Sequence, residues 1–331
     1  VEIVRINGAD SQDIIRRMRA MQEIDGYNST FEDRSIQKSF RTYFLFLYGR
    51  SESYEVHYLS VAQDTLQISL AGGVRKPKEE AAASEPATLS MTGAEFYLLE
   101  DNVGYLDLNS FSSDGYKKFY KSVFAQIAER SVEYLVLDLR GNGGGYFPNG
   151  NRLLAYLLEE DFEMKFSRPK QSIENDTHLD LPISSKMTNA LFGIIPDRKD
   201  DDPHRNYSIK YKVKSKNAYR GKLYVLIDGG SFSMSGLVAT RLKHASEAVF
   251  IGAETGGGED GSNAIIRYML TLPETQIRVM VPFYFMDHDV APATKGRGVF
   301  PDYEINYSIE EVLSGKDKEL QKVRALIEAS R

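Results

Sequence analysis

The sequence contains no cysteine. This absence excludes disulfide bonds, thiolate catalysis and zinc sites built on cysteine. It fits a cytoplasmic and a periplasmic protein equally well, so it leaves the compartment open. The sequence also lacks a block of basic residues. It contains 41 Lys and Arg and 47 Asp and Glu, which give a formal net charge of −6. Nucleic acid is therefore not expected as the main partner, since phosphate binding needs clustered Lys and Arg.

The sequence also lacks any apolar run of about 18 residues, so no segment is expected to span a membrane. What it does contain is 42% hydrophobic and 11% aromatic residues among 331, enough for one large domain or two. The chain starts at Val1 and enters a strand-like segment, "VEIVRING", at once. We interpret this start as that of a processed or truncated chain.

Residues 1–71 are predicted to form a small α+β unit, and residues 72–94, rich in Gly, Pro, Ala and charge, to form a linker. The patterns within the first unit predict one helix, with apolar residues at helical spacing, and three strands. The helix is expected at residues 11–21 and the strands at residues 1–8, 42–48 and 53–61.

From residue 95 to residue 331 strands and helices alternate, which predicts an α/β fold with a mainly parallel sheet. Segments 133–140, 222–228 and 248–254 are continuous apolar strands of the kind covered on both faces. Residues 163–220 are polar and poorly periodic, so we interpret them as an insertion. A final helix is expected after Ser308, where Glu311 completes a capping box.

A glycine-rich loop, "LDLRGNGGGYFPNGN" (137–151), follows one of these strands, at the place where α/β sheets bind ligands. The dinucleotide fingerprint fails because Tyr146 stands at its third glycine, and the phosphate-loop ending is missing. The loop could offer N–H groups to a ligand or an oxyanion, or could simply be a tight turn that needs positive φ.

A second junction, "GGSFSMSG" (229–236), carries Ser231, Ser233 and Ser235 between a strand and a helix. It is not the G-x-S-x-G nucleophile elbow, since position 231, where the motif has its first glycine, is Ser. At least one serine is expected to cap the helix. A serine there would also lie beside free N–H groups at the positive end of the helix dipole, which favours an oxyanion.

Two later segments have plainer interpretations. "GAETGGGEDGSN" (252–263) is expected to be another turn, and its acidic residues argue against phosphate binding. "KGRGVFPDYEI" (295–305) is a turn followed by a strand, with Lys295 and Arg297 expected to be solvated.

Taken in order, "LVLDLRGNGGG", "LIDGGSFSMSG", "FIGAETGGG" and "GRGVFPD" resemble the carboxy-terminal processing (tail-specific) protease family, most of all its tricorn-core and interphotoreceptor retinoid-binding branch. The similarity covers about residues 95–331, and "INGADSQDII" (6–15) resembles part of the family's PDZ-like domain. The resemblance implies a crotonase-like (ClpP/crotonase) α/β core, an incomplete PDZ-like unit at 1–71, a serine nucleophile, no metal or cofactor, and protein or peptide substrates.

By position, the family's nucleophile falls on Ser233. The resemblance then implies an oxyanion hole formed by the N–H of Met234 and one from the glycine loop, that of Gly143 or Gly144. Ser231 and Ser235 are interpreted as structural.

The general base departs from the family pattern. The lysine-dependent branch keeps its base 25 residues after the nucleophile, which falls on Gly258 here, and glycine cannot accept a proton. The tricorn-like branch uses a histidine upstream of the PDZ-like segment, which would lie before Val1, and an acidic residue near the position of Lys295 and Arg297. The candidate within this sequence is His288, with Asp287 and Asp289 beside it to orient the imidazole; the other histidines are interpreted as structural or solvated: His57, His178, His204 and His244.

The expected function is that of a serine endopeptidase or carboxy-terminal processing peptidase acting through Ser233, weakened here by the missing base. The substrate is expected to lie extended beside a sheet edge. The alternatives are a non-catalytic protein that binds a peptide or an apolar ligand on the same fold, and a scaffold whose PDZ-like part recruits a partner chain. The resemblance implies a periplasmic or cell-envelope location. Substrate preference and oligomeric state stay open.

Overall fold

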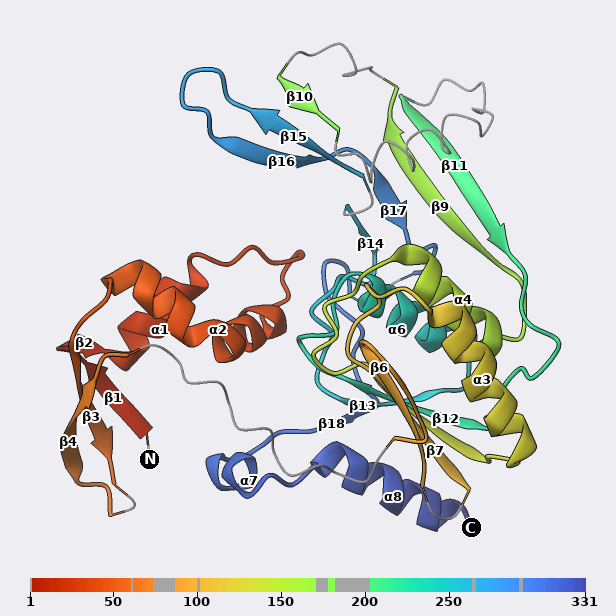
Figure 1. Cartoon of the computed structure of the whole chain (residues 1–331), viewed down its shortest axis with the longest axis horizontal. Helices are drawn as coiled ribbons and strands as arrows, with labels where there is room; N and C mark the ends of the chain where they lie inside the picture. Colours follow the sequence, from red (N-terminus) through yellow and green to blue (C-terminus); the bar gives the residue numbers. More distant parts are fainter. Residues whose placement is uncertain are drawn as a thin grey trace. The chain divides into compact units, whose positions relative to one another are not determined.

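The computed structural model describes residues 2–60, 62–73, 87–99, 102–170, 178–181, 203–263, 266–291 and 294–331. The chain divides into two compact units, one made of residues 1–24 and 29–86 and the other of residues 25–28 and 87–331 (Figure 1). In the described ranges no helix is long and apolar enough to cross a membrane.

The first unit is an α+β structure with an antiparallel sheet in the order β2-β1-β3-β4. Its elements are β1 (Glu2–Ile6), β2 (Ala9–Asp10), α1 (Ser11–Arg19), α2 (Thr30–Tyr48), β3 (Ser53–Leu59) and β4 (Thr65–Ala71). Its core is formed by buried apolar side chains from the sheet and both helices: Ile6, Ile14, Met18, Ile36 and Phe44.

The strand predicted at 42–48 is wrong, because these residues form the second half of α2. Ile36, Phe40, Phe44 and Tyr48 lie four residues apart, which places them on one face of a helix. The ring centroids of Phe40 and Phe44 are 5.9 Å apart and those of Phe44 and Tyr48 are 4.9 Å apart. In the sequence, residues 43–48 form an unbroken apolar run, so the four-residue spacing was not apparent.

The second unit is built on a seven-stranded sheet in the order β18-β13-β12-β8-β7-β6-β5. The strands from β18 to β7 pair in parallel, and β6 and β5 extend one edge antiparallel. Its strands are β5 (Leu89–Met91), β6 (Ala94–Leu98), β7 (Val103–Leu108), β8 (Tyr134–Asp138), β12 (Lys222–Ile227), β13 (Val249–Gly252) and β18 (Tyr303–Glu304). The mainly parallel α/β fold is therefore confirmed, although β5 lies inside the range predicted as a linker.

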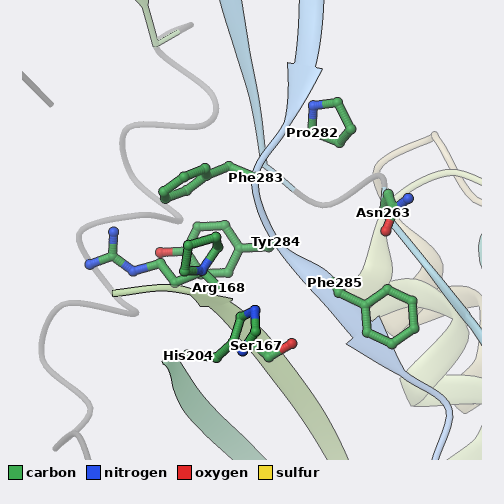
Figure 2. A pocket seen from close by; sticks show the side chains of 9 residues that line it. Ser167, Arg168, His204, Asn263, Pro282, Phe283, Tyr284 and Phe285 are labelled. Atoms are coloured by element: carbon green, nitrogen blue, oxygen red, sulfur yellow. The ribbon is translucent and has the colours of Figure 1, made fainter. Parts of the chain in front are cut away.

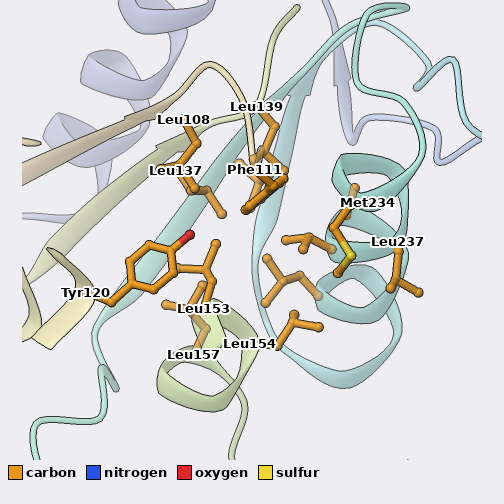
Figure 3. Close-up of a cluster of buried hydrophobic side chains, with 14 of the residues drawn as sticks. Leu108, Phe111, Tyr120, Leu137, Leu139, Leu153, Leu154, Leu157, Met234 and Leu237 are labelled. Carbon is orange, nitrogen blue, oxygen red and sulfur yellow. The ribbon is translucent and has the colours of Figure 1, made fainter. Parts of the chain in front are cut away.

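Helices cover both faces of this sheet. The helices of this unit are α3 (Tyr116–Glu129), α4 (Phe147–Leu157), α6 (Met234–Ala245), α7 (Ile309–Ser314), which buries no side chain, and α8 (Lys318–Ser330). On one face, Leu137 of β8 packs in the main core with side chains of α4 and α6 (Figure 3). On the other face, Val136 contacts Val323 and Ile327 of α8. Successive strand residues thus point to opposite apolar layers, which explains why the strand is apolar throughout.

The segment predicted as a polar insertion contains two long strands in its described part, β9 (Phe162–Pro169) and β11 (His204–Tyr211), paired antiparallel along their whole length. They belong to a sheet in the order β11-β9-β17-β14, with β17 (Phe285–Asp287) and β14 (Gly261–Ser262). Met164 and Phe166 are buried, an alternation that the neighbouring charges obscure in the sequence. A third sheet, in the order β10-β15-β16, comprises β10 (Leu179–Asp180), β15 (Arg267–Thr271) and β16 (Arg278–Pro282).

The capping box of Ser308 and Glu311 is present at the start of α7. The predicted helix after Ser308 is therefore confirmed as α7, which ends at Ser314 before Gly315 in a left-handed conformation, and a second helix, α8, capped by Asp317, follows it.

Candidate active site

The three glycine-rich loops meet at one edge of the sheet. They follow β8, β12 and β13, which are adjacent parallel strands, so their carboxyl ends point the same way. Phe232 N–H donates to the Asn142 carbonyl at 3.0 Å, and Gly257 N–H donates to the Ser231 carbonyl at 3.2 Å. Motifs separated by about a hundred residues in the sequence therefore form one contiguous surface.

One carboxylate joins the first two loops. Asp228 Oδ1 accepts hydrogen bonds from Gly141 N–H at 2.7 Å and from Gly230 N–H at 2.8 Å. A Cβ on Gly230 would lie 2.7 Å from the Cα of Gly141, so the two backbones are in direct contact. Asp228 thus sets how closely the loop of residues 141–145 approaches the serine motif.

The first loop is also held from its other side. Arg140 pairs with Asp138 at 2.6 Å, with Asp317 at 2.8 Å and with Glu319 at 3.1 Å. Asp317 and Glu319 lie at the start of α8, and Glu319 is buried. Arg140, which precedes the glycine loop, is therefore bound by ion pairs both to the end of β8 and to the last helix.

The three serines have different environments. Ser231 Oγ donates to the Leu139 carbonyl at 2.8 Å and accepts from Asp228 N–H at 3.1 Å. Its hydroxyl therefore links the first loop to the second by hydrogen bonds. Ser235 is fully buried in α6, and its hydroxyl has no hydrogen-bond partner among the described residues. Neither is a helix cap.

Ser233 occupies the N-cap position of α6 but makes no capping hydrogen bond. Its φ of 53° and ψ of −121° lie far from the extended conformation that a capping serine adopts. The expected capping role is therefore wrong for all three serines. Positive φ in a side-chain-bearing residue is strained and persists where the surrounding structure enforces it, as at functional sites. Ser233 is half-buried at the positive end of the helix dipole.

Gly144 brings the glycine loop against Ser233. A Cβ on Gly144 would lie 2.8 Å from both the Met234 backbone nitrogen and the Ser233 Cβ, and the glycine has φ 97°. Gly144 N–H donates to Asn142 Oδ1 at 2.9 Å. By contrast, the N–H groups of Gly143 and Met234 donate no hydrogen bond to any described residue. Of the two glycines left open by the sequence, Gly143 is therefore the one whose N–H, like that of Met234, is not used in a hydrogen bond to a described residue.

The third loop contacts Ser233 through Gly257. A Cβ placed on Gly257 would lie 3.2 Å from the Ser233 backbone nitrogen. The next residue, Gly258, donates its N–H to Asp25 Oδ2 at 3.3 Å. Burial raises the pKa of Asp25, and the hydrogen bond from Gly258 opposes this rise. The position of the family's lysine thus carries a glycine beside a half-buried carboxyl group. The sequence analysis missed Asp25.

The expectation that Arg297 is only solvated is wrong, because its side chain binds Glu254. Its Nε donates to Glu254 Oε1 at 2.9 Å, and Gly298 N–H donates to the same oxygen at 2.8 Å. Glu254 is buried, so its carboxylate needs these partners. Arg297 therefore anchors the third loop, whereas Lys295 is exposed.

His288 is only 1% exposed, and its Nδ1 lies 3.1 Å from the Glu259 carbonyl. Burial lowers its pKa to about 4, and the charge of Arg241 adds to this effect. Arg241 follows Ser233 by eight residues on α6, about 12 Å along the helix axis. No contact between described residues joins His288 to Ser233.

The expectation that flanking carboxylates orient His288 is wrong. Asp289 Oδ1 pairs with Lys165 at 2.6 Å, and Asp287 Oδ1 accepts from Asp289 N–H at 2.8 Å. Of the other histidines, His57 lies 2.7 Å from Glu55 and His244 lies 2.8 Å from Glu259. Among the described residues, no cluster of His, Asp and Glu is arranged to hold a metal ion.

We expect His288 to make the protein acid-sensitive. Below pH 6.5 the unfolded chain protonates this histidine while the folded chain does not, so stability present above pH 6.5 is lost as the pH falls towards 4. The loss from this group reaches about 3 kcal/mol. Urea unfolding at pH 7 and pH 4.5 should show a smaller decrease for His288→Phe than for the wild type. An equal decrease in both proteins would contradict this account, and His57→Phe, at a histidine that is only partly buried, serves as the control.

The comparisons with known proteins agree with this geometry. The model of peptidase family S41 matches residues 102–305, more than half of the chain. The tricorn protease of Thermoplasma acidophilum is 26% identical over 234 residues, which are 69% of this chain and 17% of that protein. The chain thus spans less than a fifth of this relative.

Among solved structures, that of mature CPAF complexed with lactacystin aligns with a TM-score of 0.67 and 16% identity, over 98% of this chain and 77% of that chain. At this identity the likeness concerns the fold alone. The family match, by contrast, includes all three glycine-rich loops, the second of which is the serine junction. The chain therefore belongs to peptidase family S41, a family of serine-type peptidases.

Proposed function

We propose that the protein is a serine endopeptidase that cleaves protein or peptide substrates by acyl transfer through Ser233. The Ser233 hydroxyl attacks the scissile carbonyl, whose oxygen becomes an oxyanion held by the N–H groups of Gly143 and Met234. The peptide nitrogen leaves with a proton, and water then hydrolyses the acyl-enzyme. The observation that carries the proposal is a strained serine at a helix N-terminus beside two N–H groups that donate to no described residue.

The peptidase activity of this chain is expected to be low. The Ser233 proton needs an acceptor, and Gly258 cannot serve as one. In the described ranges no side chain is hydrogen-bonded to the Ser233 hydroxyl, and His288 is buried elsewhere. A base supplied from outside these 331 residues would raise the activity.

We expect a fluorophosphonate to label the chain slowly but to one equivalent, as measured by intact mass. Ser233→Ala should lose all labelling. The matched control is Ser235→Ala, which removes a neighbouring buried hydroxyl without a hydrogen-bond partner and should label like the wild type. Labelling that persists in Ser233→Ala would refute Ser233 as the nucleophile.

A second candidate function is peptide or apolar-ligand binding without catalysis, favoured by the glycine at position 258. A chain that stays unlabelled, also when extended upstream of Val1, would support this alternative. A carboxy-terminal processing role, a PDZ-like first unit, a crotonase-like core and a periplasmic or cell-envelope location belong to the proposal through family resemblance. Fractionation of cells that produce the natural protein tests the location.

A further inference from the structure

The turn of residues 25–28 belongs to the second unit, although its neighbours in the chain belong to the first. Asn28 N–H donates to the Asp25 carbonyl at 3.2 Å, which closes the turn. Gly26 has φ 61°, and the first central residue of a type II′ turn likewise has positive φ, which glycine adopts without a steric penalty. The sequence of the turn therefore suits the conformation that it adopts.

The two central residues of the turn dock it through their backbone on the segment that precedes Arg297. Tyr27 N–H donates to the Gly296 carbonyl at 2.8 Å. A Cβ on Gly26 would lie 2.3 Å from the oxygen of the same carbonyl, so a side chain there would push the two backbones apart. The position of the turn is thus set by backbone contacts of Gly26 and Tyr27.

The two end residues of the turn bind the third glycine-rich loop through their side chains. Asp25 Oδ2 accepts from Gly258 N–H at 3.3 Å, and Asn28 Nδ2 donates to the Thr255 carbonyl. Asn28 and Thr255 are fully buried. Gly257 lies between the two bonded positions in the chain. The backbone of Gly257 is therefore held by the turn on both sides along the chain.

Gly257 is also the residue of this loop that contacts the serine junction. Its N–H donates to the Ser231 carbonyl at 3.2 Å, and its hypothetical Cβ would lie 3.2 Å from the Ser233 backbone nitrogen. A Cβ on Gly236, in the first turn of α6, would lie 3.3 Å from the Gly257 Cα. The positive φ of Ser233 depends on such close neighbours, because a strained backbone persists only where the surrounding structure enforces it.

The turn has no part in the pocket of about 350 Å³ that Figure 2 shows. The residues that line this pocket lie on β9, β11, β16 and β17, between β16 and β17, or directly after β14. None of them comes from residues 25–28 or 252–258. The contacts of the turn with the third loop therefore indicate a role in shaping the serine junction rather than in binding a ligand in that pocket.

We propose that Asp25 and Asn28 are positioning residues of the peptidase, which hold Gly257 against the backbone of Ser233 and thereby keep its hydroxyl in the orientation for attack. This inference rests on the proposed function of Ser233. Neither side chain takes part in the chemistry. Asp25 acts by accepting a hydrogen bond from the loop rather than through its charge, so a neutral acceptor of the same shape should replace it.

The test measures the rate of fluorophosphonate labelling of the full chain over a range of reagent concentrations. Asp25→Ala should lower the limiting rate about tenfold, at an unchanged half-saturating concentration. Asp25→Asn keeps an acceptor oxygen for Gly258 N–H and should stay within about twofold of the wild type. Gly26→Ala displaces the turn without changing Asp25 and should lower the limiting rate as Asp25→Ala does.

The matched control is Asp161→Ala, which removes a carboxylate that likewise accepts one backbone hydrogen bond, from Val213 N–H at 2.9 Å. It should label like the wild type. Hydrogen exchange of the segment around Gly257, measured by mass spectrometry, adds a readout that needs no reaction. In Asp25→Ala and Gly26→Ala this segment should exchange about tenfold faster, while the strands of the second unit exchange as in the wild type.

Three results would each overturn the proposal. They are a limiting rate in Asp25→Ala equal to that of the wild type, an Asp25→Asn variant as slow as Asp25→Ala, and unchanged exchange around Gly257 in both turn variants. A wild-type chain that stays unlabelled would instead refute the proposed peptidase function. The exchange measurement would then still decide whether the turn holds the loop.

Discussion

Replacing Ser233 with alanine or glycine is expected to reduce peptide hydrolysis at least about 10³-fold. The reason is the loss of the attacking oxygen, since the N–H groups of Gly143 and Met234 can stabilise an oxyanion only after a nucleophile has attacked. The measurement is cleavage of a fluorogenic peptide, with Ser235→Ala as the control. Activity within tenfold of the wild type in Ser233→Ala would mean that the chemistry lies elsewhere.

The same two substitutions should differ in stability. Ser233 has φ 53° and ψ −121°, a conformation that glycine adopts without a steric penalty but alanine does not. Ser233→Gly is therefore expected to raise the free energy of unfolding by about 1 kcal/mol after the entropy of the unfolded glycine is included. Ser233→Ala should stay near the wild type. Urea unfolding curves compare the three proteins, and a Ser233→Gly variant that is less stable than Ser233→Ala would show that this backbone is not strained.

Asp228→Ala should slow fluorophosphonate labelling about 10²-fold, because displacing catalytic groups by about 1 Å has effects of this size. The substitution removes the oxygen that binds Gly141 and Gly230 at once, so the loop that carries Gly143 is free to move away from Ser233. Asp228→Asn keeps an acceptor oxygen and should lose less than tenfold. Weak reversible binding of the reagent should be unchanged, so that the effect lies in the rate of phosphonylation.

The matched control is Asp302→Ala, which removes a carboxylate that likewise accepts a backbone hydrogen bond, from Phe250 N–H at 2.8 Å. It should lower stability without slowing fluorophosphonate labelling of the folded protein. If Asp228→Ala and Asp302→Ala slow labelling equally at matched folded fraction, Asp228 has no positioning role.

The sequence was informative where local pattern and burial agree. The strands β8, β12 and β13 are apolar on both faces because helices cover both faces, so their runs could be read directly. The loops after them were identified because glycine stretches follow those runs. The second half of α2 was misread because further apolar residues, Leu45, Phe46 and Leu47, fill the positions between Phe44 and Tyr48.

The contacts that shape the candidate site could not be read from the sequence in the same way. Asp228 binds Gly141 across 87 residues, and Asp25 binds Gly258 across 233 residues. Nothing in the neighbourhood of either aspartate identifies its partner. The choice between Gly143 and Gly144 likewise depends on the side chain of Asn142, whose orientation only the folded loop defines.

The attachment of Arg140 to α8 changes where the second structural unit ends. The family match stops at residue 305, whereas α8 covers Lys318–Ser330. An excised domain with family boundaries would lack Asp317 and Glu319, two of the three carboxylates paired with Arg140, and would expose the apolar layer around Val136. A unit excised for recombinant work, chimeras or transplantation into another protein should therefore extend through the last helix.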